Sequence, residues 1–109
     1  MTLLCFDVDG TLDCSNGPVS VTRLNEWHDD PEGPNVVIVS PSGAYVGHLP
    51  RCSDKPTRRE CLNAAARMVG VQDQDLLLYV SDNKDYEEAH AAGFCYIEAA
   101  EFAKGMQRP

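Results

Sequence analysis

The chain has 109 residues, of which 43% are hydrophobic and 24% charged, so we expect one globular domain over residues 1–109. Nine basic against seventeen acidic residues give a net charge of −8, which repels polyanions and makes duplex DNA an unlikely partner. No apolar run reaches the roughly 20 residues that span a bilayer, no secretion signal is recognisable, and the five cysteines include no C-x-x-C pair. These features predict a cytoplasmic protein without a membrane partner.

The first half of the chain predicts two buried strands separated by a helix. The apolar run at 3–8 closes at Asp9-Gly10 and indicates a strand followed by a turn. A helix is expected from near Ser20 to before Pro31. Residues 36–40 predict the second strand, since prolines bound this apolar run on both sides.

The second half continues the alternation of helices and strands. Residues 44–54 show no readable pattern, but Thr57 as cap and Gly70 as stop frame the clearest helix, which has Met68 among its apolar positions. The remaining expected elements are a strand at 76–80, a short helix at 85–93, a strand at 94–97 and a helix at 98–104.

This alternation of apolar strands and helices predicts the α/β class. Continuous apolar strands are typical of a mostly parallel sheet with helices on both faces, so we expect a small three-layer Rossmann-like sandwich. In such sheets the functional groups gather at the carboxyl ends of the strands.

Polar residues follow three of the predicted strands. Carboxylates that converge on one sheet edge repel one another and favour a hard cation such as Mg²⁺, which suits phosphate chemistry when a lysine and backbone N–H groups share the charge. The residues concerned are Asp7, Asp9, Gly10 and Thr11, then Ser40, Ser42 and Gly43, then Ser81, Asp82 and Asp85, with Lys55 before the longest helix.

The segment FDVDGTL at 6–12 resembles the first motif of the haloacid dehalogenase superfamily, D-x-D-G-T at the end of the first strand. Its companions occur in the family's order as Ser40, Lys55-Pro56 and the acidic pair Asp82 and Asp85. The last motif departs from the pattern, because Ser81 replaces a glycine and Asp85 follows Asp82 after three residues instead of four.

The resemblance implies a Mg²⁺-dependent phosphatase in which Asp7 attacks phosphorus and forms an aspartyl-phosphate. It makes Asp9 the general acid and base and Lys55 the cation beside the nucleophile, with Arg51, Arg58 and Arg59 as competitors for that last role. The implied metal ligands are Asp7, Asp9 through its carbonyl, Asp82, and Asp85 directly or through a water. The implied phosphate-binding residues are Thr11, Ser40, Ser42 and Gly43.

Members of that superfamily that select small metabolites usually carry a cap domain, for which this chain has only 12–39 and 41–54. Because segments below about 40 residues seldom fold alone, we expect no cap domain. The open site would accept a macromolecular end, or a small phosphorylated molecule enclosed by a second subunit of a homo-oligomer. The stretch DNKDYEEAHAAGF also resembles polynucleotide 3′-phosphatases. A non-catalytic phosphate-binding or receiver-like module stays open as an alternative.

Overall fold

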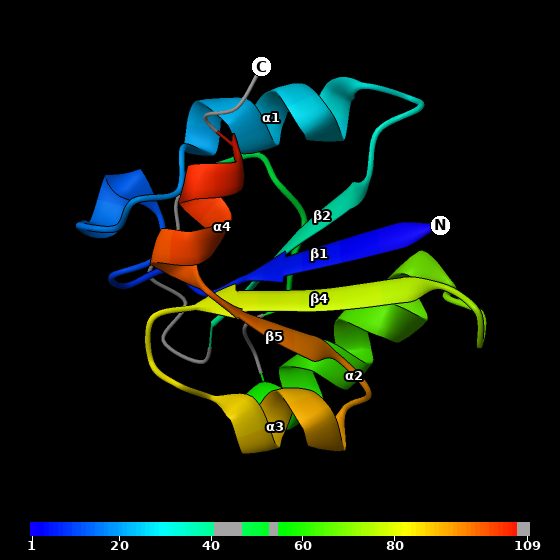
Figure 1. The fold of residues 1–109 in the computed structure, drawn as a ribbon. Coiled ribbons are helices and arrows are strands. Elements are labelled where there is room, and N and C mark those ends of the chain that lie inside the picture. The colour runs from blue at the N-terminus through cyan, green and yellow to red at the C-terminus, as the bar shows by residue number, and fades with distance from the viewer. Residues whose placement is uncertain (41–46, 53–54, 107–109) are drawn as a thin grey trace.

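The computed structural model describes residues 1–40, 47–52 and 55–106, which form an α/β fold around a five-stranded sheet. All strand pairings are parallel, and the order is β3-β2-β1-β4-β5. Figure 1 shows β1 at the centre, between β2 and β4. The elements are β1 (Thr2–Phe6), the 3₁₀ turn η1 (Asp13–Ser15), α1 (Val21–Asp29), β2 (Asn35–Val39), β3 (Arg51–Cys52), α2 (Arg58–Val69), β4 (Leu76–Ser81), α3 (Tyr86–Ala91), β5 (Cys95–Glu98) and α4 (Ala99–Met106).

Two apolar clusters form the core, one on each face of the sheet. Residues of α1 and α4 join one cluster, and residues of α2 and α3 join the other, as the two helix pairs above and below the sheet in Figure 1 show. Four of the five residues of β1 and of β2 are buried, which explains why these strands are apolar throughout rather than alternating. The prediction of an α/β fold is confirmed.

The two long helices begin where the sequence predicts. The Ser20 hydroxyl accepts a hydrogen bond from the Arg23 N–H at 3.2 Å, and Thr57 accepts one from the Glu60 N–H at the same distance. These contacts satisfy N–H groups that a helix start leaves without partners. Gly70 ends α2 with a φ of 79°, a conformation that glycine adopts without steric cost.

Some boundaries and one strand differ from the sequence-based expectation. The strand expected at 3–8 ends at Phe6, and Met68 is half exposed instead of facing the core. The short edge strand β3 pairs with the end of β2 and was not predicted, because two residues carry no periodic pattern. The described helices include none long and apolar enough to cross a membrane.

The strand order places a topological switch point between β1 and β4. The chain leaves β1 toward β2 and β3 on one side, then returns through α2 to β4 on the other side of β1. In open α/β sheets, ligands bind at such a point, just beyond the carboxyl ends of the strands. Asp7 follows β1 there, and Ser81 ends β4 beside it.

Candidate functional site

Asp7 occupies the switch point and is almost fully buried, with an exposed fraction of 1%. Its N–H donates to the Val80 carbonyl at 3.0 Å, which extends the β1–β4 pairing by one step. Its Oδ2 accepts a hydrogen bond from the Asn83 side-chain amide at 2.5 Å. Its Oδ1 lies 3.1 Å from Nη2 of Arg58, but the alignment leaves this buried oxygen without a hydrogen bond from any described residue.

The surroundings of Asp7 act on its charge in opposite directions. The pKa of Asp7 is raised to about 6, mainly by burial, and the nearby Asp85 and Asp82 carboxylates add to the rise, while Arg58 and a backbone hydrogen bond from Val8 oppose it. At neutral pH the group is therefore mostly ionised, in a place where an additional cation would stabilise it. A buried carboxylate with an unsatisfied oxygen is costly to the fold and is more typical of a functional site than of a packing position.

The loop after Asp7 is compact and ordered by its own backbone. Thr11 and Leu12 both donate to the Val8 carbonyl, at 3.1 and 3.0 Å. Gly10 has a φ of 72°, and a Cβ added there would overlap the carboxylate of Asp82. The Asp82 side chain consequently lies directly against this loop, next to the strand end that carries Asp7.

The side chain of Asp9 is exposed at the same loop, unlike that of Asp7. The Ser15 hydroxyl, in η1, donates to Asp9 Oδ1 at 2.9 Å. This hydrogen bond orients the carboxyl group. Ser15 was not predicted as a site residue, because its contact depends on how the chain folds back after Leu12.

A hydrogen-bonded cluster links the start of α2 to β4 and its following loop. Arg58 Nε donates to the Tyr79 hydroxyl at 2.8 Å and lies 3.3 Å from Asp85 Oδ2. The same Asp85 oxygen accepts hydrogen bonds from Tyr79 at 3.3 Å and from the Ser81 hydroxyl at 3.1 Å. Burial, and next the charge of Asp7, raise the pKa of Tyr79 well above its usual range. Tyr79 therefore stays protonated and serves as donor and acceptor together.

The other predicted site residues are placed as follows. Ser40 is buried directly after β2, and Thr11 is fully buried with its hydroxyl unpartnered among the described residues. Lys55 is half buried before α2, where its carbonyl faces the Cys61 thiol at 3.9 Å. In the described part of the chain, the cation in contact with Asp7 is Arg58. Ser42 and Gly43 lie outside the described residues.

The donor set at this edge fits a magnesium ion bound by few protein ligands. The buried Asp7 carboxylate keeps one oxygen without a hydrogen bond from the described residues, and Asp82 lies against the loop that follows it. Within residues 1–40, 47–52 and 55–106, no three His, Cys, Asp or Glu side chains converge closely enough to enclose a metal. Mg²⁺ commonly uses one or two carboxylates and completes its shell with water and substrate oxygens, so Asp7 and Asp82 are compatible with such a site.

Two cavities lie away from the switch point and have few charged residues in their linings. Their volumes are about 570 and 590 Å³, and both are lined by Trp27 and Phe102 between α1 and α4. The charged residues in their linings are Glu32 in one and Arg23 with Glu101 in the other. Neither lining includes a buried charged side chain, whereas the switch point has the buried Asp7 carboxylate. We therefore select the switch point by its chemistry.

Comparisons of the chain with protein-family models, curated proteins and solved structures found no match. The functional argument accordingly uses the residues of this chain and their geometry.

Sequence reasoning missed two residues that contact the central carboxylate or its cation. Asn83 stands where the resemblance gives no role, and Tyr79 reads as one more apolar position of a buried strand. The available signal for Tyr79 was its hydroxyl, because a buried tyrosine usually finds a hydrogen-bond partner. The partner itself could not be found without the position of α2.

Proposed function

We propose that this protein is a Mg²⁺-dependent phosphatase that hydrolyses a phosphate monoester through an aspartyl-phosphate on Asp7. The observation that carries the proposal is the buried Asp7 carboxylate at the switch point, ion-paired with Arg58 and with one oxygen left without a hydrogen bond. The resemblance of residues 6–12 to the haloacid dehalogenase motif supports the same chemistry. A three-layer sandwich without a cap domain and a cytoplasmic location belong to this proposal.

The reaction consists of two displacements at phosphorus. In the first, an Asp7 oxygen forms a bond to phosphorus while the ester P–O bond breaks, and Asp9 gives its proton to the departing alkoxide. In the second, Asp9 takes a proton from water, whose oxygen attacks phosphorus while the bond to Asp7 breaks. The products are an alcohol and inorganic phosphate, and both carboxyl groups return to their starting states.

The proposed Mg²⁺ ligands are Asp7, the Asp9 carbonyl and Asp82, while Asp85, whose Oδ2 is held by Arg58, Tyr79 and Ser81, would act through a water. When bound there, the ion supplies positive charge to the phosphoryl group. The chain's own contribution is to hold Asp7 in a buried place, to orient Asp9 through Ser15, and to place Thr11 and Ser40 beneath the same sheet edge. The resemblance adds Ser42 and Gly43, which lie outside the described residues, as phosphate-binding residues of this proposal.

The strand order bears on the receiver-like alternative. Receiver domains have the order 2-1-3-4-5, whereas this sheet has 3-2-1-4-5 with the acidic loop on its central first strand. This difference favours the phosphatase. We propose two substrate classes. One is a phosphorylated small molecule, enclosed by a second subunit if one is present, and the other is a macromolecular end such as a 3′-phosphorylated oligonucleotide.

The test measures hydrolysis of p-nitrophenyl phosphate with Mg²⁺, with EDTA, and by the Asp7→Asn variant. We expect turnover only in the wild type with Mg²⁺, because the variant lacks the nucleophile. Asp73→Asn is the matched control, since Asp73 is exposed in the turn between α2 and β4 at the opposite sheet edge. Undiminished activity of Asp7→Asn, or the absence of wild-type turnover, contradicts the proposal. A panel of sugar phosphates with 3′- and 5′-phosphorylated oligonucleotides then identifies the substrate class.

A further inference from the structure

Three groups fix the guanidinium of Arg58 at the switch point. Nη2 lies 3.1 Å from Asp7 Oδ1, while Nε donates to the Tyr79 hydroxyl at 2.8 Å and lies 3.3 Å from Asp85 Oδ2. The side chain is 20% exposed, so the group is mostly but not fully removed from water. A planar cation held at both Nε and Nη2 has little rotational freedom left.

Two tyrosines on neighbouring strands form the support of this arrangement. Tyr79 on β4 and Tyr96 on β5 are register partners, and their rings pack edge to face at 6.0 Å. The Tyr96 hydroxyl contacts the Ser81 hydroxyl at 3.0 Å and accepts a hydrogen bond from the Lys84 N–H at 2.9 Å. Tyr79 thus holds Arg58, and Tyr96 holds the loop that carries Asp85.

The two oxygens of Asp7 have different neighbours. Oδ2 accepts the amide hydrogen bond of Asn83, which follows Asp82 in the loop of the proposed metal ligands. Oδ1 faces Arg58 and accepts no hydrogen bond from the described residues, so no hydrogen-bond donor competes for its lone pairs. A phosphoryl group bound in line with Oδ1 would place its oxygens within reach of the same guanidinium, which suits planar recognition of a phosphate.

We infer that Arg58, positioned by Tyr79, is the cation that faces the attacking oxygen of Asp7 and binds the phosphoryl group, the role that the sequence analysis gave to Lys55. This inference rests on the proposed function and names a further residue of the same site. Arg58 donates hydrogen bonds and loses no proton during the reaction, so the proton balance of the two displacements is unchanged. Tyr79 is a positioning residue, because it acts through Arg58.

The first experiment compares kcat for Arg58→Ala, Lys55→Ala and Arg59→Ala with Mg²⁺ and p-nitrophenyl phosphate. Loss of a preorganised transition-state donor costs roughly 10²-fold or more, so Arg58→Ala should lose this amount and Lys55→Ala less. Arg59 is the next residue on α2 and is exposed, so Arg59→Ala should keep wild-type kcat. Guanidinium at millimolar concentration, far below denaturing levels, should restore part of the activity of Arg58→Ala alone. An equal or larger loss in Lys55→Ala overturns the assignment.

Arg58→Ala leaves Asp7 buried without its cation and can fail to fold. Arg58→Lys is therefore measured beside it, because lysine keeps the charge but cannot reach Asp7 and Tyr79 with two separate nitrogens. We expect a folded variant whose kcat is lowered roughly tenfold or more. Wild-type kcat in Arg58→Lys overturns the proposed fixed geometry.

The positioning role of Tyr79 is tested by a double-mutant cycle with Tyr79→Phe, which removes the hydroxyl and keeps the ring. If Tyr79 acts through Arg58, Tyr79→Phe should lower kcat in the wild type and have no further effect in the Arg58→Lys background, where its partner nitrogen is gone. A merely structural tyrosine would lower kcat equally in both backgrounds. That result would overturn its role.

A binding measurement separates this inference from the proposed function. Tungstate, a phosphate analogue, should raise the Tm of wild type and Lys55→Ala but not of Arg58→Lys, because only the fixed guanidinium binds the anion well. If the wild type binds tungstate without hydrolysing any monoester, the phosphatase proposal fails while Arg58 keeps its anion role. If tungstate shifts the Tm of Arg58→Lys as much as that of wild type, the inference fails even though turnover persists.

Discussion

At the scale of single residues, Asp7 and Asp9 show how one short loop gives two carboxyl groups different surroundings. Asp7 is buried at the end of the central strand, whereas Asp9, two residues later, is exposed and oriented by Ser15. A buried carboxylate that acts as a nucleophile is shielded from water, whereas an exposed carboxylic acid can exchange its proton with water. The difference in burial therefore matches the proposed division of roles.

The proposed role of Asp9 predicts a dependence on the leaving group. Nitrophenolate departs readily as an anion, whereas an alkoxide needs a proton, and general acid catalysis is typically worth about 10²–10⁴-fold. Asp9→Asn should therefore slow the hydrolysis of a sugar or alkyl phosphate far more than that of p-nitrophenyl phosphate. The measurement is the single-turnover rate of aspartyl-phosphate formation, because the later hydrolysis step also uses Asp9.

The control for this prediction is Asp13→Asn, an exposed aspartate of the neighbouring turn whose carboxylate accepts from the Val21 N–H at 3.2 Å. It should affect both substrates equally if it affects them at all. Equal losses for the two leaving groups in Asp9→Asn would assign Asp9 to loop or metal geometry rather than to proton transfer.

At the scale of elements, the start of α2 connects helix stability to the site. Thr57 caps the helix at the residue before Arg58, so the same turn that ends the preceding loop sets the position of the guanidinium. The N-cap hydrogen bond also satisfies a backbone donor that would otherwise lack a partner. Helix capping and site geometry are therefore linked in this segment.

We predict that Thr57→Ala lowers the free energy of unfolding by about 1 kcal/mol, since it removes this hydrogen bond. For a domain of this size the Tm should fall by about 4 °C or more, measured by thermal unfolding. Thr22→Ala, at an exposed position inside α1, is the matched control and should change the Tm little. An equal shift in both variants would contradict the capping contribution.

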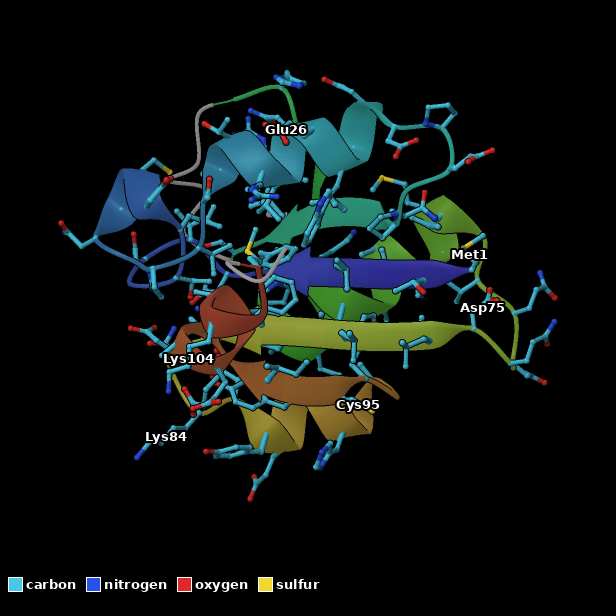
Figure 2. The ribbon with its side chains drawn as sticks, turned by 45° about the horizontal axis from the view of Figure 1, so that its top comes forward. Met1, Glu26, Asp75, Lys84, Cys95 and Lys104 are labelled. Atoms are coloured by element: carbon cyan, nitrogen blue, oxygen red, sulfur yellow. The ribbon has the colours of Figure 1, made fainter. Side chains whose placement is uncertain are left out.

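At the scale of the whole molecule, the sheet separates its two edges. The Met1 ammonium pairs with Asp75 at 3.2 Å at the amino-terminal edge, while Lys84 in the loop of the candidate site lies at the opposite end (Figure 2). Changes at the Asp75 edge thus serve as controls for changes at the site. Because the two edges belong to one folded domain, a ligand that binds only the folded site should stabilise the entire fold.

We predict that beryllium fluoride with Mg²⁺, which mimics a phosphoryl group on an aspartate, raises the Tm of the wild type. A ligand that binds only the folded chain stabilises it by about 2.7 kcal/mol at a hundredfold excess over its dissociation constant. The measurement is thermal unfolding with and without the ligand. Asp7→Asn should show no shift, and a shift of equal size in that variant would mean that the ligand binds elsewhere.

The sequence alone determined the α/β class, most of the elements and the loop that carries the candidate nucleophile. These predictions depend on residues that are close together in the sequence. The signals are the continuous apolar strands, Thr57 and Gly70 as helix boundaries, and the D-x-D-G-T motif. The polar residues expected at strand ends include Asp7, Ser40 and Asp82, which the fold places at one sheet edge.

Only the tertiary structure decided which cation stands beside Asp7 and what supports it. Arg58 and Lys55 are three residues apart in the sequence, and the choice between them depends on how the start of α2 packs against β4. Tyr79 reaches Arg58 across 21 residues of chain, and Asn83 reaches Asp7 across 76. The strand order and the edge strand β3 were likewise decided by long-range pairing. Such contacts depend on how distant segments of the chain pack together, so the spacing of residues along the sequence does not predict them.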